Sequence, residues 1–257
     1  MTIRTDKSYF HRGGKEPLLG LTIPEYFAKI VTLYPENEAV VCIEQNQRLT
    51  YAVLANQIDQ LAKGLIGLGL GKGDRIGVWS TNNLQWILLQ MASARIGAIQ
   101  VNINPAYRIH ELEYALKKSG VQCLFTIPGF KSSDYLGMLS ELLPELETHE
   151  AHQFSTKKFP SLFLVVVYEP FSSENTLRPN VGFTVWNEVI CAGEKISNEQ
   201  LDQFTNNLDT DDPINIQYTS GTTGLPKAVL LTHHNLLNNA YSAARTMHFG
   251  NKDRLCI

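Results

Sequence analysis

Between residues 50 and 127 the chain alternates helical apolar periodicity with short apolar runs. Leu54, Ile58 and Leu61 recur at intervals of three and four residues after Thr50, which predicts a long amphipathic helix capped by that threonine. The elements predicted after this helix are strands at 75–79, 98–101 and 121–127 and helices from Asn82 or Asn83 to Arg95 and over 109–118. Strands that alternate with helices of this length predict βαβ units and a parallel sheet, so the predicted fold class is α/β.

The segments on either side of this alternation are shorter and less regular. Residues 23–33 show helical spacing, and residues 39–43 form a short apolar run typical of a strand. The longest uninterrupted apolar run, residues 162–168, predicts a buried strand and is far shorter than the ~20 residues of a membrane span. The region 128–212 is less regular: residues 149–160 and 170–182 are polar and contain prolines, which predicts loops, and residues 199–212 are acidic and amide-rich.

Composition and charge narrow the class of protein. The 257 residues include 22 Lys and Arg against 25 Asp and Glu, which gives a net charge of −3. This length corresponds to one large domain or two small ones. A weakly acidic chain does not bind nucleic acid through bulk charge, so no nucleic-acid partner is expected. The four cysteines are far apart and form no CxxC pair, which predicts reduced thiols in an intracellular protein without a zinc site.

The segment that starts at Pro213 carries the candidate chemistry. Residues 214, 216 and 218 are apolar or aromatic and alternate with polar positions, which predicts a strand that enters a loop. The loop consists of Thr219, Ser220, Gly221, Thr222, Thr223, Gly224, Leu225, Pro226 and Lys227. Glycines let backbone amides approach an anion, hydroxyls donate hydrogen bonds to phosphate oxygens, and a lysine supplies positive charge. These residue types predict a polyphosphate-binding site.

Two further observations characterise this loop. It is not a Walker A motif, because two residues separate Gly224 from Lys227 and the next residues have strand character, with a helix only after Thr232. Residues 213–252 contain no Asp or Glu, and their full charges are Lys227, Arg245 and Lys252. The segment is therefore locally positive in an acidic protein. The alternative is a surface loop whose Thr, Ser and Gly content merely suits turns.

The stretch YTSGTTGLPKAVLLTHHN resembles the phosphate-loop signature of the acyl-adenylate-forming enzymes, a superfamily that includes acyl-CoA synthetases, luciferases and the adenylation domains of peptide synthetases. One departure is Ala228, where the family usually has glycine. The stretches ARIGAIQVNINPAY and DPINIQYTSGTTG look most like fatty-acyl-CoA synthetases, in particular medium-chain acyl-CoA ligases, and the resemblance covers about residues 20–257. It implies the N-terminal part of the acetyl-CoA-synthetase-like fold, with layered, parallel-rich sheets flanked by helices.

The resemblance also implies an ATP-dependent fatty acid–CoA ligase. In that reaction a fatty carboxylate and ATP give acyl-AMP and pyrophosphate, and coenzyme A then displaces AMP. The implied small-molecule partners are the fatty acid, ATP and coenzyme A, with Mg²⁺. Residues 219–227 are expected to hold the β- and γ-phosphates, with Lys227 and Thr222 as catalytic residues and Thr219 as a contact to Mg²⁺. The expected compartment is the cytoplasm, or the mitochondrial matrix if a eukaryotic precursor has lost its transit peptide.

Residues 1–257 are expected to be an incomplete N-terminal adenylation domain. In the family, the adenine pocket, the acidic metal ligand and the catalytic lysine follow the phosphate loop, and a C-terminal lid domain closes the site; the sequence stops at Ile257 without them. The chain alone is therefore expected to be inactive. Two alternatives stay open: an amino-acid or aryl-acid adenylating enzyme, and a non-catalytic remnant that binds nucleotide.

Other residues with reactive or aromatic side chains have a structural and a functional interpretation. His233 and His234 are expected to cap and pack the start of a helix rather than bind a metal. Trp79, Trp86 and residues 88–91 are expected in the core, with the lining of a fatty-acyl channel as the alternative.

Overall fold

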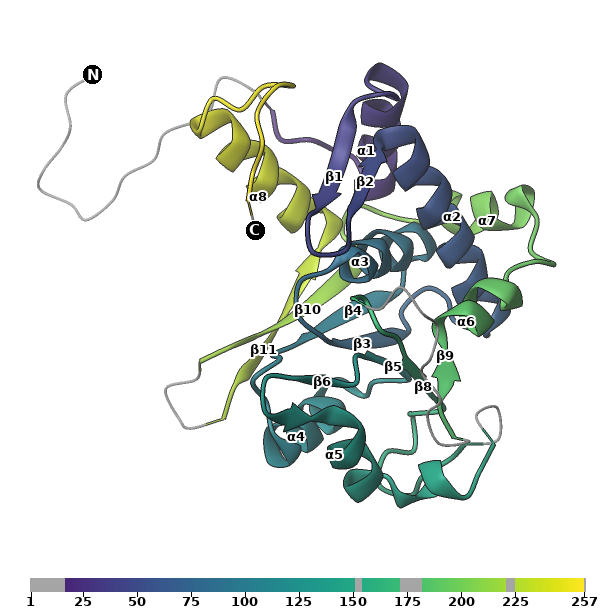
Figure 1. Ribbon diagram of the computed structural model, residues 1–257. Helices are drawn as coiled ribbons and strands as arrows, with labels where there is room; N and C mark the ends of the chain where they lie inside the picture. Colours follow the sequence, from purple (N-terminus) through teal and green to yellow (C-terminus); the bar gives the residue numbers. More distant parts are fainter. Residues whose placement is uncertain (1–16, 151–153, 172–181, 221–224, 257) are drawn as a thin grey trace, which may run out of the picture.

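The computed structural model describes residues 17–150, 154–171, 182–220 and 225–256, which form an α/β fold (Figure 1). The helices are α1 (Ile23–Leu33), α2 (Tyr51–Gly67), α3 (Leu84–Ile96), α4 (Ile109–Ser119), α5 (Tyr135–Leu142), the 3-10 helix η1 (Pro144–Glu147), α6 (Trp186–Ala192), α7 (Asn198–Asn206) and α8 (His233–Thr246). The strands are β1 (Glu38–Cys42), β2 (Gln47–Thr50), β3 (Arg75–Trp79), β4 (Ile99–Ile103), β5 (Cys123–Thr126), β6 (Gly129–Phe130), β7 (Ser133–Asp134), β8 (Leu164–Val167), β9 (Thr184–Val185), β10 (Pro213–Thr219) and β11 (Lys227–Thr232). Within the described residues, no helix is long and apolar enough to span a lipid bilayer.

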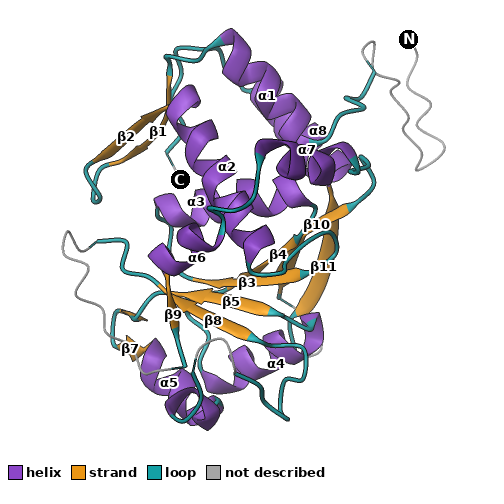
Figure 2. Cartoon of the chain, turned by 90° about the vertical axis from the view of Figure 1, so that its right-hand side faces the viewer, coloured by secondary structure: helices purple, strands orange, loops and turns teal. Residues whose placement is uncertain are grey.

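The central sheet has the strand order β11-β10-β4-β3-β5-β8-β9. Its neighbouring strands are parallel except for β10 and β11, which are antiparallel. Helices α2, α3 and α6 lie over one face of the sheet, and α4 and α5 lie over the other (Figure 2). The chain passes from β3 to β4 on one side and then crosses β3 to reach β5 on the other, so the strand order reverses at β3. In open α/β sheets ligands bind at such a reversal, outside the carboxyl ends of the strands.

The elements predicted between residues 50 and 127 are confirmed, and their starts are fixed by side-chain caps. Thr50 accepts a hydrogen bond from the backbone of Val53 at the start of α2, and Asn83 caps α3 in the same way. Trp79 is fully buried, as predicted, and its ring stacks on Tyr135 with 3.6 Å between ring centroids. The four cysteines form no disulfide within the described residues.

The region 128–212 is more regular than the sequence predicts. It contains α5, η1, α6 and α7, and the first part of the acidic stretch 199–212 belongs to helix α7. A capping box starts α7, with Ser197 at the N-cap and Gln200 three residues later, and Leu201 is its buried residue. Helices α6 and α7 are only a few turns long, so the packing of α6 against α2 and of α7 against α2 and α3 stabilises them more than their own periodicity does.

Candidate functional site

The predicted polyphosphate loop connects β10 to β11 in the sequence, and these two strands pair antiparallel at one edge of the sheet (Figure 1). Thr219 ends β10, Lys227 begins β11, and the two residues are partners in the antiparallel register. Thr219, Ser220 and Lys227 are exposed. Gly221, Thr222, Thr223 and Gly224 lie outside the described residues. The predicted order of strand, loop, strand and helix is confirmed, whereas phosphate binding by this loop stays a prediction.

Two tyrosines fix the hairpin to helix α4. The hydroxyl of Tyr218 donates a hydrogen bond to the carbonyl of Ala115 at 2.9 Å and lies 2.9 Å from the hydroxyl of Ser119. Burial raises the pKa of Tyr218, which keeps its hydroxyl protonated and able to donate. The hydroxyl of Tyr114 donates to the carbonyl of Pro226 at 3.1 Å. Helix α4 therefore contacts both strand β10, which precedes the loop, and Pro226 near the end of the loop.

Helix α8 follows β11 directly, and its first residue is the buried His233. Thr232 caps the helix by accepting a hydrogen bond from the backbone of Asn235 at 3.2 Å. The Nδ1 atom of His233 accepts a hydrogen bond from the backbone of Ile23 at 3.2 Å, which connects α8 to the start of α1. Among the residues that the structure describes, no three His, Cys, Asp or Glu side chains form a group that could hold a metal ion. The predicted packing role of His233 is confirmed.

We expect the stability of the protein to fall between about pH 6.5 and pH 4 because of His233. Burial lowers the pKa of His233 from 6.5 to about 4; Asp212 and Glu25 partly oppose this shift and Lys72 adds to it. Between these pH values the unfolded chain binds a proton at His233 that the folded chain does not, so the free energy of unfolding is fully retained above pH 6.5 and decreases as the pH falls. For this one group the loss is about 2 kcal/mol between pH 7.5 and pH 5.

Urea unfolding at these two pH values measures the decrease. His233→Gln is expected to reduce its pH-dependent part, because glutamine does not titrate. His234→Gln changes the next residue of α8, which is only half-buried, and serves as the matched control that keeps the full decrease. Equal decreases in the wild type and in His233→Gln would contradict the assignment.

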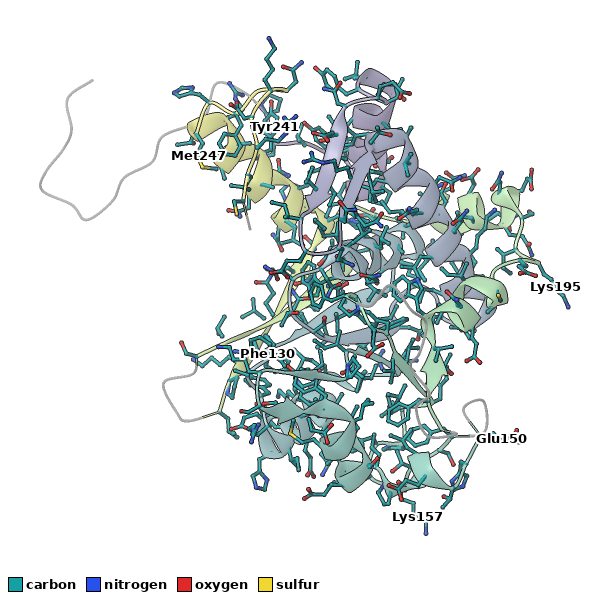
Figure 3. The ribbon with its side chains drawn as sticks, viewed as in Figure 1. Phe130, Glu150, Lys157, Lys195, Tyr241 and Met247 are labelled. Carbon is teal, nitrogen blue, oxygen red and sulfur yellow. The ribbon has the colours of Figure 1, made fainter. Side chains whose placement is uncertain are left out.

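A cleft of about 940 Å³ opens beside the hairpin, at the carboxyl ends of β10, β4 and β3. Its polar lining includes Ser80, Asn102, Asn104 and Gln217, and its aromatic lining includes Trp86 and Phe130. Phe130, labelled in Figure 3, comes from strand β6. The cleft lies next to the reversal of strand order at β3, which is the expected position of a ligand site in this type of sheet.

Two sets of residues in and around the cleft differ in how well the sequence predicts them. Trp86 is half-buried and lines the cleft, so its core assignment is only partly right, whereas Leu88 and Leu89 are buried as predicted. The amide side chains of Asn102 and Asn215 meet beside the cleft, and the sequence analysis does not identify them. The available signal was the alternation of amides along β4 and β10, which is also typical of an exposed face.

Thr219, the predicted contact to Mg²⁺, offers one exposed hydroxyl oxygen. Proteins usually bind Mg²⁺ through one or two carboxylates together with the phosphates of a substrate. Residues 213–252 contain no carboxylate side chain, and the described part of the chain contains no larger group of metal-binding residues. These residues therefore do not form a Mg²⁺ site by themselves.

Comparison with known proteins gives sequence relatives over nearly the whole chain. A family model described as AMP-binding enzyme matches residues 27–257. The chain is 38% identical over 236 residues to the mitochondrial medium-chain acyl-CoA ligase ACSF2 of Homo sapiens, and 38% identical over 234 residues to that of Danio rerio. Each match covers 91% of this chain and 37% of the relative, so the chain spans well under half the length of these curated relatives.

Solved structures share the fold at lower sequence identity. The inhibitor-bound N-terminal domain of FACL13 from Mycobacterium tuberculosis matches with a TM-score of 0.63 and 22% identity, over 87% of this chain and 47% of that one. The anthranilate CoA ligase AuaEII in complex with anthranoyl-AMP matches with a TM-score of 0.64 and 19% identity, over 85% of this chain and 36% of that one. The predicted fold, the N-terminal part of the acetyl-CoA-synthetase-like fold, is therefore confirmed.

Proposed function

The chain belongs to the family of AMP-binding enzymes, and on this premise we propose that it forms the phosphate-binding part of an ATP-dependent fatty acid–CoA ligase. The observation that carries the proposal is the β10–β11 hairpin, which presents Thr219, Ser220 and Lys227 at its tip, beside a cleft at the carboxyl ends of parallel strands. The identity of 38% to medium-chain acyl-CoA ligases supports a fatty acid as the substrate. On this proposal residues 1–257 belong to an adenylation domain that a C-terminal lid domain closes.

In the proposed first step a fatty carboxylate attacks the α-phosphorus of ATP and pyrophosphate leaves; coenzyme A then displaces AMP in the second step. Negative charge grows on the leaving pyrophosphate, so fixed donors and a positive charge near it lower the barrier. Lys227 supplies that charge, and the hydroxyls of Thr219, Ser220 and Thr222 supply donors. Mg²⁺, held mainly by the phosphates, would neutralise further charge, and Thr219 is the one residue of this segment proposed to contact it.

Acyl-CoA synthesis by the full-length protein that contains this chain is the direct test. ATP–pyrophosphate exchange, measured separately with octanoate, benzoate and a set of amino acids, reports which acid is adenylated. Exchange with octanoate and formation of octanoyl-CoA support the proposal. Exchange with an aryl acid or an amino acid alone would favour the alternative adenylating enzymes, and ATP binding without exchange would favour the non-catalytic remnant.

The proposed compartment is the cytoplasm or the mitochondrial matrix. The human and zebrafish relatives carry the word mitochondrial in their names. The cytoplasm and the mitochondrial matrix both stay predictions for this chain, and imaging of the full-length protein would distinguish them.

We expect Tyr114→Phe in the full-length protein to raise the KM for ATP by about three- to tenfold, because it removes the hydrogen bond that holds Pro226 at the exit of the loop. The aromatic ring stays, so the packing against Tyr218 is retained. Tyr107→Phe is the matched control. Its ring also packs against Tyr218, but its hydroxyl has no hydrogen-bond partner within the described chain. Equal KM values for ATP in the two variants would contradict a role of Tyr114 in positioning the loop.

A further inference from the structure

Strands β4 and β10 carry a column of amide side chains on one face of the sheet. Gln100 and Asn102 lie two residues apart on β4, and Asn215 and Gln217 lie two residues apart on β10. In the parallel register Asn215 pairs with Gln100 and Gln217 pairs with Asn102. Because side chains alternate between faces along a strand, all four point to the same face. The column runs from the buried centre of the sheet to the cleft.

The buried end of this column determines the orientation of Asn102. Gln100 and Asn215 are fully buried. The amide nitrogen of Gln100 donates to Asn102 Oδ1 at 2.9 Å and to Gln90 Oε1 at 3.3 Å. The amide nitrogen of Asn215 donates to the same two oxygens, at 3.3 Å and 3.2 Å. The oxygen of Asn102 is therefore occupied by two buried donors, and its Nδ2 group has no partner among the described residues.

The opposite orientation of these amides is less favourable. Rotating all of them would leave the NH₂ groups of Gln100 and Asn215 buried without acceptors. In the observed orientation the atoms without partners within the described chain are the oxygens, Gln100 Oε1 and Asn215 Oδ1. Unpaired carbonyl oxygens are tolerated in protein interiors more often than unpaired N–H groups. The Nδ2 group of Asn102 therefore faces the cleft that this residue lines.

The position of Asn102 relates it to the hairpin. Gln217 is its cross-strand partner, and Thr219 lies two residues further along β10 on the same face, about 7 Å from Gln217 along the strand. A group bound at Asn102 therefore lies close to a phosphate held at Thr219. Trp86 and Phe130 supply apolar surface in the same cleft.

We propose that Asn102 Nδ2 binds the carboxylate of the acid substrate, and that Gln90, Gln100 and Asn215 are positioning residues that hold its amide in place. This proposal rests on the proposed function and assigns a site for the acid. A carboxylate accepts hydrogen bonds only, and a neutral amide donor orients it without neutralising the charge that makes it a nucleophile. In the adenylation step, a carboxylate oxygen forms a bond to the α-phosphorus of ATP. The bond from that phosphorus to the bridging oxygen breaks, and its electron pair leaves with pyrophosphate. No proton is transferred.

The test compares Asn102→Asp with the wild type in the full-length protein. Aspartate keeps the oxygen that accepts from Gln100 and Asn215 but replaces the donor by a second oxygen. We expect the Kd of carboxyl-¹³C-labelled octanoate, followed by NMR, and its KM in pyrophosphate exchange to rise about tenfold or more, with the Kd of ATP unchanged. Gln100→Met, which removes the buried donor, is expected to raise the KM for octanoate and not that for ATP.

A second variant separates the lost donor from the added charge. Glu44 is an exposed carboxylate in the lining of the same cleft. The double variant Asn102→Asp with Glu44→Gln restores the net charge of the cleft but not the donor, so octanoate binding stays weak on this proposal.

Each other outcome overturns the proposal. An active wild type with the same octanoate affinity as Asn102→Asp overturns the carboxylate site and leaves the proposed function intact, as does full recovery in the double variant. Parallel losses of octanoate binding, ATP binding and thermal stability in Asn102→Asp indicate a merely structural cluster. A wild type that adenylates no carboxylic acid removes the proposed function and this site with it.

Discussion

Lys227→Ala in the full-length protein is expected to slow adenylate formation about 10²-fold, with little change in the affinity for the fatty acid. Lys227 is the one full charge in the segment 219–227, and it stands at the first position of β11, opposite Thr219. Its proposed partner is the pyrophosphate, whose negative charge grows as the bond to the α-phosphorus breaks. An interaction that strengthens in the transition state affects the rate more than it affects binding of the ground state. ATP–pyrophosphate exchange at saturating octanoate measures this rate.

The matched control is Lys118→Ala, which removes an equal charge from an exposed position at the end of α4. It is expected to leave the exchange rate unchanged. Lys227→Arg is expected to recover part of the rate, because it keeps the charge but not the compact shape of the ammonium group. Unchanged exchange in Lys227→Ala would remove the hairpin lysine from the proposed chemistry.

The sequence predicts the elements between residues 50 and 127 nearly to the residue, because their signals are local. Thr50 and Asn83 cap helices by accepting a hydrogen bond from a backbone amide three residues away. The regularly spaced apolar residues of α2 are buried in the core. The hairpin is predictable for a similar reason. A strand pattern on each side of a Gly- and Thr-rich loop is contained in fewer than twenty consecutive residues.

The residues that complete the candidate site cannot be predicted in this way, because they meet through the order of the strands. Asn102 and Asn215 are more than a hundred residues apart, and only the parallel pairing of β4 with β10 brings them together. Tyr114 on α4 and Pro226 are also more than a hundred residues apart, and only the tertiary structure brings them into hydrogen-bond contact. From the sequence, polar residues at every second position of a strand indicate an exposed face. In this protein two of those amides are fully buried against α3, which makes the cluster a feature of the tertiary structure.

Residues 1–257 as an isolated chain are expected to make no acyl-CoA from octanoate, ATP and coenzyme A, which is the largest effect predicted for this protein. Adenylation needs a closed site without bulk water, in which the nucleotide and the carboxylate are held together. The described residues offer an open cleft and one threonine hydroxyl for Mg²⁺, without an acidic cluster. The chain matches 37% of the human relative, so most of that relative has no counterpart in it. A thioester assay by mass spectrometry, with the full-length protein as the positive control, measures this loss.

The isolated chain is also expected to associate with itself and to bind ATP at most weakly. Within the described residues β11 is the outermost strand of the sheet, and its consecutive residues Val229 and Leu230 point to opposite faces and are 38% and 53% exposed. An unpaired strand edge with exposed apolar side chains on both faces favours pairing with other chains. Size-exclusion chromatography and binding of a dye specific for apolar surface measure this exposure. A soluble monomer of residues 1–257 that makes acyl-CoA would contradict both expectations, because the hairpin and the cleft would then have to support adenylation and thioester formation by themselves.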